Sequence, residues 1–245
     1  MTKKTKTIIV VMVMVLIAGI LLIIRSPREP EAFLTDKQVI KRINSFFPES
    51  EPKVIQDVLY LDDTHVFVPF INESKEYGMS FWVWKDNKWR AASVDNGGVL
   101  KAWNGEGDSF FMWNLDPKDE VYEIRTFMIK DRNFRASRDE GTYQPGIEMM
   151  HSIMTENKTY GVEKYPDNWR TLRNQYAALQ KKIPDFDEFF EDGQALKLAN
   201  RFYDKDGKEV FPTMPNEGIG YSTGNDYVDV PYLFDLVDDE MEGSY

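Results

Sequence analysis

Residues 79–94 read MSFWVWKDNKWRAASV, and this stretch decides the fold that we expect. Aromatic and β-branched residues dominate 79–84 and 89–94, which favours two strands. The polar residues 85–88 between them are typical of a tight turn. Strands joined by so short a connection run antiparallel. The stretch therefore predicts a β-hairpin.

The same alternation continues on both sides of this hairpin. Runs of apolar and β-branched residues are separated by turn residues such as Asp95-Asn96-Gly97-Gly98 and Asp116-Pro117. Further strands are expected at 54–61, 65–71, 99–103, 110–113 and 121–130. Together they predict an antiparallel β-meander.

A helix is expected directly before the meander. Thr35 is a good N-cap, and Gln38 three residues later completes a capping box. Val39 and Ile43 then lie on one face, and Pro48 ends the helix. We expect this helix to cover one face of a curled sheet.

Helical spacing returns after about residue 138. Apolar residues recur every three or four positions in 146–154 and 168–183, and a third helix is expected at 195–203. Strands followed by helices indicate an α+β fold rather than alternating βαβ units. The predicted fold is thus one helix plus an antiparallel β-meander, followed by a helical C-terminal region that packs on the sheet.

The N-terminus contains an unbroken apolar run from Ile8 to Ile24, with three lysines before it and two arginines after it. At about 1.5 Å per residue these residues form a helix of about 25 Å, the short end of what crosses a bilayer. A cleaved signal peptide is the alternative, but small residues are missing from the end of the run. The run predicts a single transmembrane signal anchor.

Lysine and arginine are more frequent before the run than after it, which favours a cytoplasmic N-terminus and an extracytoplasmic C-terminal part at the cell membrane. The predicted organisation has five parts: a tail (1–7), the anchor (8–24), a linker (25–34), helix plus meander (35–138), and a mainly helical region with an acidic tail (139–245).

The net charge of the chain excludes some classes of binding partner. The chain carries −11 in total, and because residues 1–28 contribute five basic side chains and no acid, residues 29–245 carry −16. Such a domain repels nucleic acid, so no nucleic-acid partner is expected.

Three motifs suggest chemistry, and each lacks its context. Gly220-Tyr221-Ser222-Thr223-Gly224 matches the nucleophile elbow of α/β-hydrolases, but no histidine follows it. Glu148 and His151 have the spacing of a di-iron ligand pair in a single copy only, and residues 204–207 do not fit a calcium loop. We therefore assign no catalytic, metal-binding or cofactor-binding residue and expect no cofactor.

Two groups of residues are candidates for ligand binding. Trp82 and Trp84 lie on one face of a strand, where they form either core or an aromatic platform for sugar rings. A basic segment stands out in the acidic domain and either holds an anionic group or offsets neighbouring acids; it contains Lys130, Arg132, Arg135 and Arg138.

The sequence thus predicts a non-catalytic binding or interaction module for a partner protein or an anionic cell-wall polymer. The alternative is a hydrolase that uses two carboxylates, one of them desolvated, in a shared cleft. A structural subunit of a membrane complex is a third possibility, which predicts an exposed apolar patch.

Overall fold

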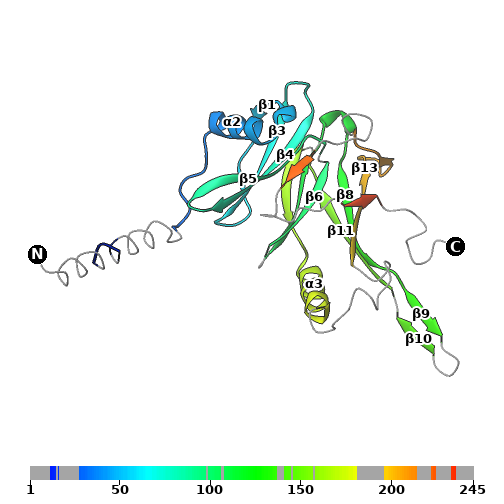
Figure 1. The fold of residues 1–245 in the computed structure, drawn as a ribbon. Coiled ribbons are helices and arrows are strands. Elements are labelled where there is room, and N and C mark those ends of the chain that lie inside the picture. The colour runs from blue at the N-terminus through cyan, green and yellow to red at the C-terminus, as the bar shows by residue number, and fades with distance from the viewer. Residues whose placement is uncertain are drawn as a thin grey trace, which may run out of the picture.

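The computed structural model describes residues 12–14, 16, 28–97, 99–105, 108–136, 141–144, 146–156, 158–180, 196–213, 222–224 and 233–235. In this part of the chain, strands outnumber helices and form three main sheets, here called A, B and C. Figure 1 shows helix α2 beside sheet A at one end and sheet C at the other.

Sheet A has the order β1-β3-β4-β5-β15, with β2 paired to β3, and all its pairs are antiparallel. Its tight turn at Asp86 and Asn87 has both residues in the left-handed conformation (φ 53° and 58°), as a two-residue hairpin loop requires. The strands are β1 (Pro52–Ile55), β2 (Leu59–Tyr60), β3 (His65–Asn72), β4 (Tyr77–Lys85), β5 (Lys88–Asp95) and β15 (Ser222–Gly224).

Sheet B has the order β12-β7-β6, and sheet C has the order β11-β8-β13-β14. The strands of sheet B are β6 (Leu100–Asn104), β7 (Ser109–Asn114) and β12 (Tyr160–Lys164). Those of sheet C are β8 (Glu123–Lys130), β11 (Ile147–Met154), β13 (Lys197–Tyr203) and β14 (Glu209–Val210), with β16 (Phe234–Asp235) parallel to β13. A small hairpin of β9 (Asn133–Ala136) and β10 (Gly141–Gln144) projects from β8 and β11 (Figure 1).

In the described residues, the three larger apolar clusters lie between these layers. Helix α2 (Asp36–Phe46) buries Val39 and Ile43 against one face of sheet A. The opposite face of sheet A meets sheet B around Phe67 and Met112. The largest core lies between sheets B and C, where Trp169 of helix α3 (Asp167–Gln180) is 1% exposed. Sheet B is therefore buried on both faces.

The N-terminal helix is confirmed, and the structure corrects the predicted fold class after residue 138. Residues 146–154 and 195–203, expected as helices, form β11 and β13 in the residues described. Both are long partners of β8, in full antiparallel register. The strands expected between 54 and 130 are present, but they form parts of three sheets rather than one curled meander. The chain is a layered, mainly antiparallel β structure without a helical C-terminal region in the part described.

The predicted membrane anchor also needs correction. In the parts of the chain that the structure describes, no helix combines the length and apolar character needed to cross a bilayer. Most of the run from Ile8 to Ile24 lies outside the described residues; Met12–Met14 and Leu16 are described and helical. The single-pass topology, and the cell-membrane location inferred from it, are therefore not supported.

Candidate functional site

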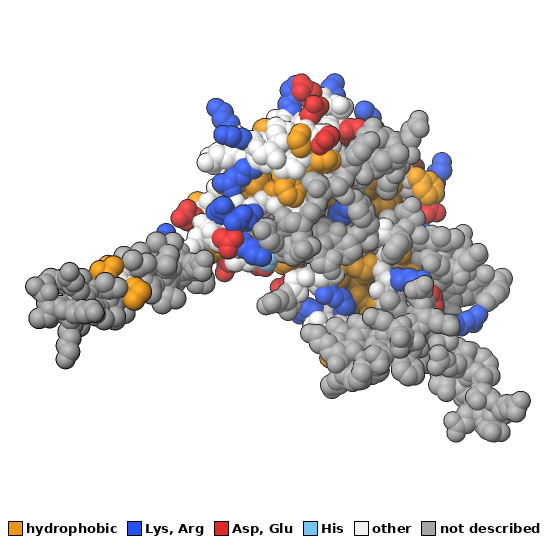
Figure 2. All heavy atoms as spheres, viewed as in Figure 1, with side chains coloured by type: hydrophobic (Ala, Val, Ile, Leu, Met, Phe, Trp, Pro, Cys, Tyr) orange, Lys and Arg blue, Asp and Glu red, His pale blue; other side chains and the backbone are white. Residues whose placement is uncertain are grey.

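Four connections meet at one end of the layered sheets, which we call the loop end. They are the β3–β4 turn, the segment between β7 and β8 that contains the 3₁₀ turn η2 (Pro117–Asp119), the β11–β12 connection and the β13–β14 turn. In Figure 2, acidic and basic side chains mix over the β3–β4 turn at the top of the view. Loops held by a rigid scaffold are common positions for binding residues.

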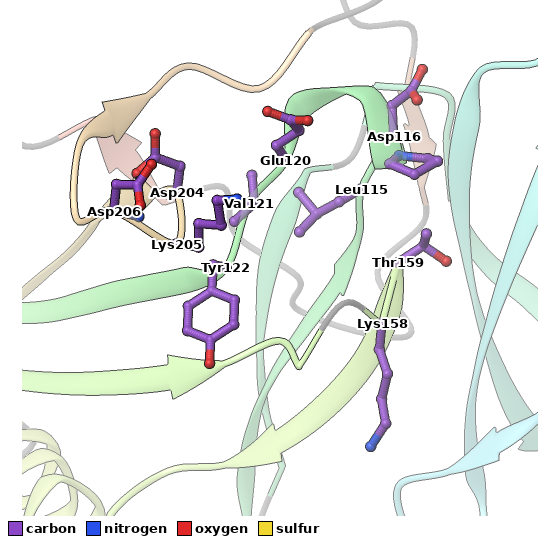
Figure 3. Close-up of a pocket in the computed structure, with 11 residues that line it drawn as sticks. Leu115, Asp116, Glu120, Val121, Tyr122, Lys158, Thr159, Asp204, Lys205 and Asp206 are labelled. Carbon is purple, nitrogen blue, oxygen red and sulfur yellow. The ribbon is translucent and has the colours of Figure 1, made fainter.

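The first hollow at the loop end has a volume of about 320 Å³. Buried Leu115 and Val121 form its apolar part, with the turn of residues 204–206 on one side and Asp116 and Thr159 on the other (Figure 3). Its remaining lining residues are Pro117, Glu120, Tyr122 and Lys158.

A second hollow of about 370 Å³ adjoins the first and shares Leu115 and Asp116 with it. The β3–β4 turn supplies its opposite wall, and Asn114 at the end of β7 belongs to its lining. The other lining residues are Ser74, Lys75, Glu76, Tyr77, Gly97, Val99, Lys118, Asp119 and Thr213. One short segment, residues 114–120, contributes to the lining of both hollows.

Several carboxylates of the two hollows are occupied by local hydrogen bonds. Asp116 Oδ1 accepts from the backbone N–H of Lys118 at 2.9 Å and so caps η2. Asp204 Oδ1 accepts from the N–H groups of Asp206 and Lys208, both at 2.9 Å, which makes residues 204–208 a turn. Asp119 accepts from the N–H and the hydroxyl of Thr213. These acids hold the loops in shape.

The backbone at the loop end is strained at three positions. Lys75, Glu120 and Glu156 have φ values of 68°, 50° and 51°, in the left-handed region that side chains of this kind rarely adopt. Each such residue costs on the order of 1 kcal/mol and persists only where its surroundings impose it, often at functional sites. Three of the four connections therefore contain a residue with a strained backbone.

Trp82 and Trp84 both belong to the core region between α2 and sheet A. Trp82 is fully buried, and its Nε1 donates to Ser80 Oγ at 2.9 Å. Trp84 is half-buried, and its Nε1 donates to the backbone carbonyl of Arg28 at 3.0 Å. Sugar binding at these residues stays a prediction.

The segment 28–34, which we call the strap, lies across this aromatic region. Its Phe33 makes edge-to-face contacts with Tyr60, Trp82 and Trp89, at ring-centroid distances of 6.4, 5.6 and 5.1 Å. Trp89 Nε1 donates to the carbonyl of Glu31 at 2.9 Å. In this structure the strap therefore covers the surface that a flat ligand would need.

The basic segment is only partly described. Lys130 is 8% exposed at the end of β8, and Arg132 is exposed. Arg135 lies in β9, whose side chains are outside the described set, and Arg138 is itself outside the described residues. Anion binding by this segment stays a prediction, because the structure does not place the four side chains together.

The other sequence motifs take structural positions. Ser222 lies in the edge strand β15, opposite Asp95, and not at a strand-to-helix turn; Gly220 and Tyr221 are outside the described residues. His65 Nδ1 lies 2.9 Å from Asp62 Oδ2, and His151 Nε2 lies 3.7 Å from Glu163 Oε1. In the described part of the chain, no group of three or more metal-ligating side chains is present.

Among the described residues, four carboxyl groups have a pKa that is shifted from its ordinary value, and in all four the pKa is lowered. Hydrogen bonds from Lys53, Lys164 and Arg125 lower the pKa of Glu73, Asp108 and Glu123, respectively. For Asp62, burial raises the pKa, but hydrogen bonds from Thr64 and His65 outweigh it and the pKa is lowered. A catalytic acid needs a raised pKa, so these four groups are held as anions for structural pairing.

The loop-end hollows were not predicted from the sequence. Their residues come from connections that are far apart in the chain, and turn signals at residues 95–98, 116–117 and 204–207 did not show that these connections meet. Comparison of the chain with protein-family models, with curated proteins and with solved structures finds no match.

Proposed function

We propose that this chain is a non-catalytic binding module that holds an extended segment of a partner protein across the two hollows of the loop end. The adjoining hollows that share Leu115 and Asp116 are the observation that carries the proposal. Apolar residues form the floor and charged residues the rim, which is the usual composition of a protein-binding site.

A peptide segment fits this surface better than a large flat partner does. Each hollow has room for a few side chains, and the shared Leu115 is 4% exposed between them. Both acids and lysines line the two hollows, so a partner with both charges finds complementary positions. An anionic polymer is disfavoured by the net charge of the chain.

Site-specific cross-linking tests this proposal directly. The chain has no cysteine, so a single introduced cysteine carries a photoreactive label at a known position. Thr159→Cys labels the first hollow and Ser74→Cys the second, whereas Lys37→Cys on the exposed face of α2 is the control. We expect the same partner to be captured from both hollows in the native cell, and not from α2.

The captured partner is then titrated in pure form. Lys158→Glu reverses a charge on the rim of the first hollow, and we expect it to weaken binding at least about tenfold. Lys37→Glu makes the same charge change on α2 and serves as the matched control. Equal effects of the two variants, or equal cross-linking from all three positions, contradict the proposal.

A further inference from the structure

The second hollow contains a buried side chain whose orientation is fixed. Asn114 is 2% exposed, and its Nδ2 donates to the carbonyl oxygens of Phe70 at 3.1 Å and Gly78 at 2.7 Å. Gln56 Oε1, at 2.8 Å, is a third acceptor, so the two N–H groups of this amide are shared among three oxygens. Backbone carbonyls can only accept, so the amide nitrogen must face sheet A and the oxygen must face away from it.

The oxygen of the Asn114 carboxamide takes no part in these hydrogen bonds. Asn114 Oδ1 is buried and has no hydrogen-bond partner among the described residues. Asn114 also belongs to the lining of the second hollow. A buried acceptor without a donor costs about 1–3 kcal/mol, so a native structure that keeps one needs a reason. A donor that enters the hollow supplies that reason.

Lys75 and Lys118 of the lining are exposed side chains, and the less exposed polar groups beside Asn114 include further acceptors. Asp116 lines the same hollow, and within the described ranges its second oxygen, Oδ2, pairs with the ammonium of Lys118 at 3.8 Å, on a side chain that is 84% exposed. Burial, and then the negative charge of Asp116, raise the pKa of the Tyr77 hydroxyl in this hollow. Val99 and Leu115 add buried apolar wall. The hollow therefore favours a cation on an apolar stem.

We propose that the second hollow binds the guanidinium group of an arginine from the partner segment, with Asp116 and Asn114 Oδ1 as its acceptors. This inference rests on the proposed function and names the chemistry of the partner. A guanidinium is flat and donates in several directions, so it can serve a carboxylate and a deep carboxamide oxygen together. The net charge of −11 favours the approach of a cationic group at long range.

The test uses two peptides of equal shape and different charge. Acetyl-Gly-Arg-Gly-amide is compared with the same peptide that carries citrulline, the neutral isostere of arginine, by calorimetric titration of the full chain at low salt. We expect the arginine peptide to bind at least about tenfold more tightly. Equal affinity of the two peptides, or no binding at millimolar concentration, overturns the inference.

Two variants separate local contact from overall charge. Asp116→Asn removes the carboxylate and keeps a good cap for η2. Glu148→Gln makes the same change in net charge on the exposed face of β11, away from the hollow. We expect Asp116→Asn to abolish the preference for arginine and Glu148→Gln to leave it within about twofold. Equal losses in both variants overturn the inference.

Failure of this inference is distinguishable from failure of the proposed function. If the peptides do not discriminate while cross-linking from Thr159→Cys and Ser74→Cys still captures one partner, the loop end binds a segment and the arginine assignment is wrong. If cross-linking also fails, the loop end is not the binding site.

Discussion

The ion pair between Lys101 and Asp95 joins sheet B to sheet A, and its removal should be costly. Lys101 Nζ lies 2.6 Å from Asp95 Oδ2, and the two side chains are 4% and 1% exposed. Asp95 Oδ1 also accepts from the N–H of Gly97 at 2.8 Å. Removal of one partner of such a buried pair leaves a buried charge, which typically costs about 3–5 kcal/mol.

We expect Lys101→Met and Asp95→Asn each to lower the free energy of unfolding by about 3–5 kcal/mol at pH 7. Asparagine keeps an acceptor for Gly97, so the loss from Asp95→Asn reports mainly the missing charge. The double variant has no buried charge in this pair, and we expect it to lose less than the two single variants combined, by at least about 2 kcal/mol. Urea denaturation of all four proteins measures this coupling, and additivity within about 0.5 kcal/mol refutes the reasoning.

The same pair predicts how stability changes with pH. Burial lowers the pKa of Lys101 to about 8, against an ordinary value of 10.5, although Asp95 acts in the opposite direction. Between these two values the unfolded chain binds more protons than the folded one, so the free energy of unfolding rises with pH. The rise is at most about 1.4 kcal/mol per pH unit from this group. The Lys101→Met variant lacks the ammonium group, so its free energy of unfolding should not show this rise. If the free energy of unfolding changes equally with pH in the wild-type and variant proteins between pH 8 and 10.5, the lowered pKa of Lys101 is refuted.

Three further predictions concern backbone strain and packing. Glu120→Gly relieves a left-handed residue and should raise the free energy of unfolding by about 1 kcal/mol, measured in urea; a loss of stability would show that the glutamate side chain contributes more than the strain costs. Gly161→Ala places a Cβ against the ring of Trp113 and should lower the stability by about 1–3 kcal/mol, and an unchanged melting curve contradicts this. Phe33→Ala removes the strap contact with Trp89 and should both destabilise the chain by about 1–3 kcal/mol and alter tryptophan fluorescence; an unaltered emission spectrum would mean that the strap is not docked in solution.

The first half of the fold could be read from the sequence because its signals are local. Thr35 and Gln38 fix the start of α2, where Gln38 Oε1 accepts from the N–H of Thr35 at 2.9 Å. The hairpin of β4 and β5 follows from its aromatic runs and its two-residue turn. In both cases the residues that decide the structure are within a few positions of one another.

The second half could not be read in this way, because distant partners decide it. In β11 the apolar residues fit two periods: Met150 and Met154 suggest a helix, yet Met149 and Ile153 lie on the inner face of a strand. The exposed fractions of Met150 and Met154, 57% and 47%, show that the helical stripe is not the buried one. Pairing with β8 makes residues 147–154 a strand rather than a helix. A short window of sequence around β11 does not contain β8, so it could not predict this.

The loop-end hollows are hidden from the sequence for the same reason. Asn114 is ordinary in its local sequence, and only its position between sheet A and η2 leaves its oxygen without a donor. Asp116 carried a turn signal, which its cap on η2 bears out, but nothing local shows that it lines two hollows.

The pairing of β15 with β5 has a consequence for synthesis of the chain. Ser222 lies opposite Asp95, so part of the β5 edge, in a sheet built early in translation, is covered by a strand that is made more than a hundred residues later. Until then, β5 presents open backbone groups that other nascent chains can pair with. The interval in which this part of the β5 edge is exposed to aggregation therefore lasts until residues 222–224 have been made.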